Sequence, residues 1–249
     1  MSALSLRILA CLFMLLDHIG YCLGGSHPLY LPLRCIGRLA FPIFVFLIVN
    51  GFRHTSSRPR YALRLALFAA VSQVPFALFC GQKTYFSNGN VFVTLLICLL
   101  VLWATNALRR QKWLKWFAFL PSLAVFALYY FGLLHSDYGA KAILMTMTFY
   151  LFDGKYTLTA AGMLVSVYNG RLISLGFAVL HLLQGRDVSL TPLSRWEWAQ
   201  LCSLAALVPI FLYNGKKGRS PKSPAAAKAA QLGFYLFYPA HLLLLWVLR

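Results

Sequence analysis

Charged residues are scarce in this chain of 249 residues, and acidic residues are the scarcest of them. Only 11% of the residues are charged and 60% are hydrophobic, whereas an average soluble domain carries roughly 25% charged residues. A water-soluble protein of this length could not bury so much apolar surface. The composition therefore excludes a soluble fold, and we expect lipid to cover the chain.

The motifs of several enzyme classes are also absent. The five carboxylates are widely scattered and no H-E-x-x-H occurs, so we predict no metal site. A G-x-S-x-G nucleophile elbow and a Walker phosphate loop are missing as well. The six cysteines show no C-x-x-C spacing and lie in or beside apolar runs. We interpret them as small buried hydrophobes.

Long apolar segments are what the chain has in abundance. Each approaches the ~20 residues that a helix needs to cross ~30 Å of hydrocarbon. No segment is long enough for a separate soluble domain, so we predict a single membrane domain over residues 1–249. The clearest runs are Ile8–Leu23, Cys35–Phe52, Leu63–Cys80, Val91–Leu108 and Trp116–Leu134.

The basic residues give the chain a net charge of +18. They are divided among short loops rather than along one stripe, which argues against a nucleic-acid partner. Cytoplasmic loops collect Lys and Arg, so we predict that three basic clusters and the N-terminus are cytoplasmic. An alternative role for some of the charge is to bind an anionic cosubstrate. The clusters are Arg53, Arg58, Arg60 and Arg64; Arg109, Arg110, Lys112 and Lys115; and Lys216, Lys217, Arg219, Lys222 and Lys228.

The middle of the chain decides the number of spans. Hydropathy divides it into five segments, and an odd number would place the third basic cluster opposite the other two. We therefore expect one short segment, 157–168 or its neighbour, not to cross. The prediction is an all-α, polytopic transmembrane bundle of about nine spans (8–10). The five segments are 116–134, 139–152, 157–168, 171–184 and 198–213.

Three ionisable residues, Asp17, His18 and Arg38, lie inside apolar runs. Such a side chain costs ~2.5–3.5 kcal/mol at the centre of a span, so it normally faces protein or water and has a role. We predict that Arg38 pairs with Asp17, with Arg34 one turn earlier on the same face. For a helix that starts near Ile8, a rise of ~1.5 Å per residue puts His18 near the middle of the membrane. The alternative is a pair that only fixes helix packing.

Other polar residues leave two interpretations open. His241 begins the last span and faces either the site or the lipid headgroups. Asp137 follows a turn and either binds a substrate or caps the helix that starts near Tyr138. His27 lies in an accessible loop and has no partner visible in the sequence.

Several of these segments together resemble the TraX family. The resemblance begins at Met14-Leu-Leu-Asp-His-Ile-Gly20 and continues from Arg34 through Phe41-Pro-Ile-Phe-Val-Phe46 to Gly51. It spans nearly the whole chain, although Arg109–Leu134 and Tyr156–Ala199 show no match. The remaining matches are His54-Thr55, Tyr61–Arg64, Ser72–Phe76, Asp137–Gly139, Tyr213–Gly218 and Tyr235–His241.

This resemblance implies an acetyltransferase of the bacterial inner membrane that uses acetyl-CoA and acetylates the N-terminus of pilin. The opening is also similar to that of a wider superfamily of transmembrane acyltransferases, including the lysosomal heparan-α-glucosaminide N-acetyltransferase and the acyltransferase-three proteins. Those enzymes pass acyl groups from cytosolic acyl-CoA to an acceptor beyond the membrane. A loop histidine is important in the lysosomal relative, so either His18 or His27 is the base.

On this basis we predict acetyl transfer beside His18, which acts as a general base or as a transient acetyl carrier. Asp17 would orient the base or hold Arg38, and Arg38 would stabilise the oxyanion. The acceptor is an amine or hydroxyl of a protein, such as a pilin N-terminus, or of a glycan. Guanidinium forks suit phosphate oxygens. The predicted acetyl-CoA-binding residues are Arg34, Arg53, Arg60, Arg64, His241, Lys216 and Lys217.

A small-molecule or proton-coupled transporter is the alternative function. Asp17, His18 and Arg38 inside the membrane would serve a proton relay equally well. The chain lacks convincing repeated halves, which many transporters show. A scaffold without chemistry would leave these three residues without a role.

Overall fold

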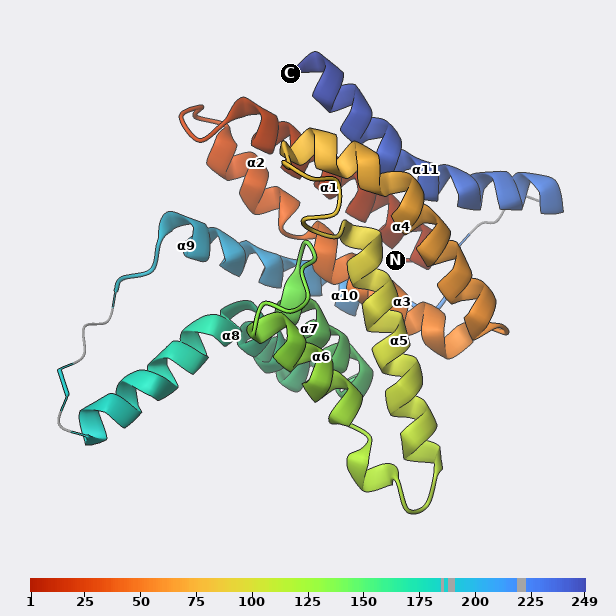
Figure 1. The fold of residues 1–249 in the computed structure, drawn as a ribbon. Coiled ribbons are helices and arrows are strands. Elements are labelled where there is room, and N and C mark those ends of the chain that lie inside the picture. The colour runs from red at the N-terminus through yellow and green to blue at the C-terminus, as the bar shows by residue number, and fades with distance from the viewer. Residues whose placement is uncertain (185, 188–190, 219–222) are drawn as a thin grey trace.

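The computed structural model describes residues 1–249 except 185, 188–190 and 219–222, and the described chain is a bundle of helices without a β-strand (Figure 1). The predicted all-α class is confirmed. The elements are α1 (Ala3–Leu23), α2 (Tyr30–Gly37), α3 (Ala40–His54), α4 (Arg58–Cys80), α5 (Val91–Arg110), η1 (Lys115–Phe117), α6 (Leu120–Tyr130), α7 (Gly139–Leu151), α8 (Tyr156–Leu183), α9 (Arg195–Leu201), η2 (Cys202–Ala206), α10 (Leu207–Phe211) and α11 (Pro224–Leu248).

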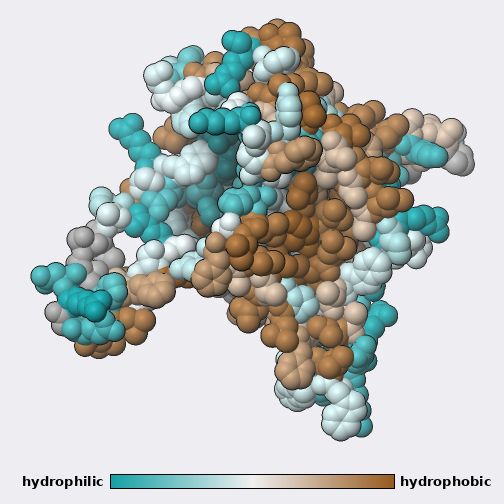
Figure 2. All heavy atoms as spheres, viewed as in Figure 1, coloured by the Kyte–Doolittle hydropathy of each residue, from teal (hydrophilic) through white to brown (hydrophobic). Residues whose placement is uncertain are grey.

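Six helical stretches of the described chain are long and apolar enough to cross a membrane. Many large apolar side chains are exposed on them, and Figure 2 shows such residues covering much of the face over α5. The protein is therefore a multi-pass membrane protein. Shorter helices occupy residues 115–130, 139–151 and 195–211, so the predicted number of about nine spans is approximate. The six stretches are Ala3–Leu23, Tyr30–His54, Arg58–Cys80, Val91–Arg110, Tyr156–Leu183 and Ala225–Leu248.

The predicted segments 157–168 and 171–184 correspond to the two parts of α8, which spans 28 residues and ends at Leu183. The two parts meet at a kink rather than a loop. At this kink Tyr168 has the non-helical angles φ −103° and ψ 16°. The side-chain amide of Asn169 donates to the carbonyl oxygen of Ser166 at 2.7 Å. This hydrogen bond satisfies a carbonyl group beside the kink.

The start of α1 and the loop before α11 lie together at one end of the bundle, which we call the basic end. The first two amides of α1 donate to the carbonyl oxygens of Lys216 and Lys217, at 2.9 and 3.1 Å. Asn50, near the end of α3, donates to the hydroxyl of Tyr213 at 3.0 Å. The first and third basic clusters thus share this end, as their charge predicts. Two members of the third cluster lie outside the described residues, namely Arg219 and Lys222.

Two glycines allow α2 to approach α1 closely. A Cβ atom added at Gly37 would lie 2.2 Å from the Cβ of Asp17, and one added at Gly20 would lie 2.9 Å from the Cβ of Leu33. Small residues let helix backbones come together in membrane proteins. The close approach brings the basic residues of α2 over the acidic residue of α1.

The first helix begins earlier than predicted. Ser2 caps it by accepting from the amide of Ser5 at 3.2 Å, so α1 starts at Ala3 rather than near Ile8. With a rise of about 1.5 Å per residue, His18 lies about 22 Å from the first residue of α1 and about 8 Å from the last. His18 therefore lies in the half of α1 that is farther from the basic end.

Candidate active site

Asp17 is held by two arginines at the α1–α2 contact. Arg38 Nη2 donates to both carboxylate oxygens, at 2.6 and 2.7 Å, and Arg34 donates to Oδ2. Only 9–11% of each of these side chains is exposed. Both guanidinium groups also lie 4.8 Å from the ring centre of Trp196 in α9, in cation–π geometry. The predicted Asp17–Arg38 pair is confirmed, and Arg34 joins it.

His18 contacts His241 of α11 rather than its sequence neighbour Asp17. Nδ1 of His241 lies 2.6 Å from the carbonyl oxygen of Phe237, which can only accept, so this nitrogen carries a proton. Nε2 of a neutral His241 is then an acceptor, and Nδ1 of His18 donates to it across 2.7 Å. The remaining nitrogen, Nε2 of His18, keeps its lone pair and has no hydrogen-bond partner among the described residues. This tautomer is the one that a general base requires.

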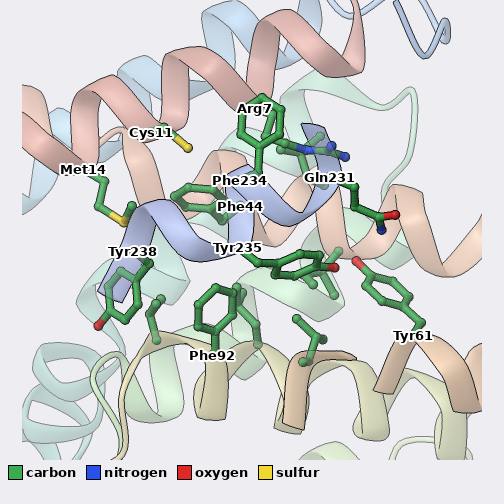
Figure 3. A pocket seen from close by; sticks show the side chains of 15 residues that line it. Arg7, Cys11, Met14, Phe44, Tyr61, Phe92, Gln231, Phe234, Tyr235 and Tyr238 are labelled. Carbon is green, nitrogen blue, oxygen red and sulfur yellow. The ribbon is translucent and has the colours of Figure 1, made fainter. Parts of the chain in front are cut away.

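An apolar cavity of about 120 Å³, the inner channel, runs between α1 and α11. Figure 3 shows Arg7, Tyr61 and Gln231 toward one end of it and Met14 and Tyr238 toward the other. The end of the channel that Arg7 lines is at the basic end of the bundle, because Arg7 lies in the first turns of α1. The channel thus connects a basic, polar mouth with the interior.

Two further cavities continue this line. The outer cavity, of about 270 Å³, is lined by the Asp17 cluster, His18 and Trp196. Between it and the inner channel lies a small junction cavity of about 20 Å³, which Met14 and Tyr238 share with the channel and which His18 shares with the outer cavity. Figure 2 shows hydrophilic residues around a hollow on the side of α2 and α9. His18 therefore lies where an apolar channel and a polar cavity meet.

Two charged residues near the start of α7 complete the outer cavity. Asp137 and Lys141 both line it. Asp137 is exposed to this cavity, and the nearby guanidinium groups of Arg38 and Arg34 favour its charged form. At neutral pH the carboxylate predominates and is available to a cation. Because no side chain caps α7, the capping role considered for Asp137 is wrong.

The residues predicted to bind acetyl-CoA lie on two sides of the molecule. Arg53 is engaged by Asp153 and donates to the carbonyl oxygen of Tyr150 at 2.9 Å. Arg64 lies over the ring of Tyr61, at 5.6 Å, beside the mouth of the inner channel. Three more side chains are exposed, those of Arg60, Lys216 and Lys217.

Arg34 and His241 do not lie with these basic residues. Arg34 binds Asp17 at the outer cavity, and His241 is 5% exposed and bonded to His18. The loop histidine that competes with His18 as the base is also elsewhere. His27 accepts from the amide of Leu29 at 3.1 Å and lines none of the three cavities.

Sequence reasoning missed Arg7, Trp196 and Tyr238. One signal was available for Arg7, because it lies seven residues before Met14 and eleven before His18. This spacing places the three on one face of a helix, and that face lines the channel and the junction cavity. Trp196 and Tyr238 carry no comparable signal, since their proximity to the site depends on how separate helices pack.

Comparisons with known proteins show which family the chain belongs to. The model of the TraX protein family matches residues 2–249. The "Probable fimbrial assembly protein FimC, serogroup H1" of Dichelobacter nodosus is 30% identical over 261 aligned positions, which cover 98% of this chain and 94% of the relative. No solved structure matches the chain significantly. Since the family match extends over almost every residue, this chain belongs to the TraX family.

Proposed function

We propose that the protein is a membrane-embedded acetyltransferase that moves an acetyl group from acetyl-CoA to an amine. One observation carries the proposal: His18, whose Nε2 has no hydrogen-bond partner among the described residues, lines both the outer cavity and the junction cavity that adjoins the inner channel. A donor and an acceptor that arrive from opposite sides would meet at this atom. Membership of the TraX family supports the same activity.

Acetyl-CoA would approach from the basic end, which we place in the cytoplasm of a bacterium, with the protein in the inner membrane. Its phosphates would meet Arg60, Arg64 and the two lysines before α11, whose side chains face the same end as the channel mouth. Guanidinium groups pair well with phosphate oxygens. The pantetheine arm would extend along the inner channel and bring the thioester to the junction cavity.

In the proposed reaction, the acceptor nitrogen attacks the thioester carbonyl carbon while Nε2 of His18 takes a proton from that nitrogen. The carbon–sulfur bond then breaks, and the proton passes to the departing sulfur, so that CoA leaves as a thiol. Asp17 positions the cluster by holding Arg34 and Arg38 rather than by touching the base. The carboxylate of Asp137 favours an amine over a hydroxyl, because it can hold an ammonium group in the outer cavity. That group gives up one proton to water before its nitrogen attacks.

The His18–His241 bond leads to a first prediction. His241→Ala should lower the rate of acetyl transfer about 10-fold or more at neutral pH, because Nδ1 of His18 loses its acceptor and the base is no longer held in one tautomer. His241→Gln should recover part of the rate, since its amide oxygen can accept from His18. Rates measured from pH 5 to 9 test the positioning role: the Ala variant should show an altered pH profile. Equal rates and profiles in the parent and the Ala variant would contradict it.

A second prediction concerns the donor. Arg60→Gln and Arg64→Gln should each weaken CoA binding, by about 1.5–3 kcal/mol for each lost charge-assisted hydrogen bond. Calorimetric titration of CoA into the protein in lipid nanodiscs measures this directly. Arg110→Gln, in the basic cluster after α5, is the control and should leave affinity unchanged. Parent affinity in both Arg60→Gln and Arg64→Gln would remove these residues from the donor site.

Purified protein in nanodiscs, given acetyl-CoA and an amine-terminated peptide, tests the proposed function. We expect stoichiometric appearance of free CoA and N-acetylated peptide. The series of cavities would also serve a transporter, the alternative function. Accumulation of a small molecule in proteoliposomes, without any release of CoA from acetyl-CoA, would favour that alternative and overturn the acetyltransferase.

A further inference from the structure

The chemistry proposed above creates a need that the charged cluster does not meet. When an amine attacks a thioester, the carbonyl oxygen becomes negatively charged and requires hydrogen-bond donors. Arg38, the residue first considered for this role, uses Nη2 to bind both oxygens of Asp17 and does not line the junction cavity. Donors on the other wall of that cavity are therefore of interest.

The phenol hydroxyl of Tyr238 is one such donor. Tyr238 is 3% exposed, and its hydroxyl has no hydrogen-bond partner among the described residues. A buried polar group without a partner costs about 1–3 kcal/mol, and native structures contain few of them. Its ring lies 6.3 Å from that of His18, and the residue lines both the inner channel and the junction cavity.

The amide of Val91, the first residue of α5, is a second donor at the same place. The Asn90 side chain caps the next two amides, of Phe92 and Val93, at 2.9 and 3.4 Å. The Val91 amide has no hydrogen bond among the described residues. Val91 lines the same two cavities as Tyr238.

This helix terminus is held firmly. Asn90 is fully buried, and its side-chain amide donates to the backbone of Ala69 at 2.7 Å and to Gln73 at 2.8 Å. The first amides of a helix also carry the positive end of its dipole, and α5 is 20 residues long. The position is thus rigid, electropositive and largely removed from water.

We propose that the Tyr238 hydroxyl and the Val91 amide form an oxyanion site for the thioester carbonyl oxygen of acetyl-CoA. This inference rests on the proposed acetyltransferase function. In the tetrahedral intermediate, the electron pair of the carbonyl π bond resides on this oxygen, while Nε2 of His18 holds the acceptor's proton. When the carbonyl re-forms, the carbon–sulfur bond breaks and CoA thiol departs. The unpaired hydroxyl is then a donor kept for the reaction.

Two substitutions test the site. Tyr238→Phe removes only the hydroxyl and should lower kcat by about 10²–10³-fold. The KM for acetyl-CoA should not fall below that of the parent, and neither should the thermal stability. Val91→Pro removes the amide hydrogen at the first helical position, where proline is well tolerated, and should also lower kcat. Tyr150→Phe is the control. Its hydroxyl donates to Asn106 at 3.3 Å, away from the cavities, so it should keep the parent rate.

A spectroscopic measurement separates a hydrogen bond from a packing effect. In the parent, the infrared carbonyl stretch of bound acetyl-CoA labelled with ¹³C at the carbonyl should lie at lower frequency than in Tyr238→Phe. Rates within twofold of the parent and an unshifted stretch in both variants would overturn the oxyanion site while leaving the acetyltransferase intact. A parent that releases no CoA from acetyl-CoA would overturn both.

Discussion

His18→Ala should reduce acetyl transfer by about 10²–10⁴-fold, the usual effect of removing a general base. Its Nε2 is the one ring nitrogen of the His18–His241 pair that is free to take a proton, because the other three positions are fixed by the bonds to His241 and Phe237. Alanine cannot accept that proton. The inner channel and the basic mouth do not depend on the imidazole, so CoA affinity should stay close to that of the parent.

The control for this experiment is the competing histidine. His27→Ala should retain the parent rate, because His27 lines none of the three cavities. CoA release from acetyl-CoA and formation of acetylated peptide are measured for both variants, together with their melting temperatures. If His27→Ala loses transfer while His18→Ala keeps it, the base is His27. A loss of stability alone in His18→Ala, with an unchanged rate per folded molecule, would assign His18 to packing.

Asp17→Asn should destabilise the folded protein by about 3–5 kcal/mol, because it leaves two buried arginines without their counter-charge. Arg34 and Arg38 both bind this carboxylate, and each is about one-tenth exposed. Their remaining contacts are the ring of Trp196 and, for Arg34, the ring of Tyr21 and the backbone oxygen of residue 17. None of these replaces an ionic partner. Thermal and denaturant unfolding of the protein in lipid nanodiscs measure the loss.

The chain offers a matched comparison for Asp17→Asn. Asp153 pairs with Arg53 at the basic end, where 64% of the acidic side chain is exposed. An exposed pair is worth at most about 1 kcal/mol, so Asp153→Asn should change stability little. In the double variant Asp17→Asn/Arg38→Met, removing one uncompensated charge should recover part of the loss. Equal stability of Asp17→Asn and Asp153→Asn would show that water reaches the Asp17 cluster.

The candidate site was only partly predictable from the sequence. Asp17, His18 and Arg38 stood out because ionisable residues are costly in apolar helices. The sequence did not pair His18 with His241, because the two residues are 223 positions apart and helical spacing relates only residues of one helix. The roles of Arg34 and Tyr238 likewise depend on contacts between helices.

For the fold, the sequence alone determined the helical membrane class, because lipid must cover apolar residues and a helix satisfies its own backbone there. It also determined the shared end of the first and third basic clusters, through the charge of their loops. The tertiary structure decided the rest. It made the boundary between residues 157–168 and 171–184 a kink at Tyr168 within α8 rather than a loop, and the side chain of Asn169 satisfies a carbonyl group beside it. It also placed His18 between the inner channel and the outer cavity, since cavities form where helices pack imperfectly and hydropathy does not record how helices pack.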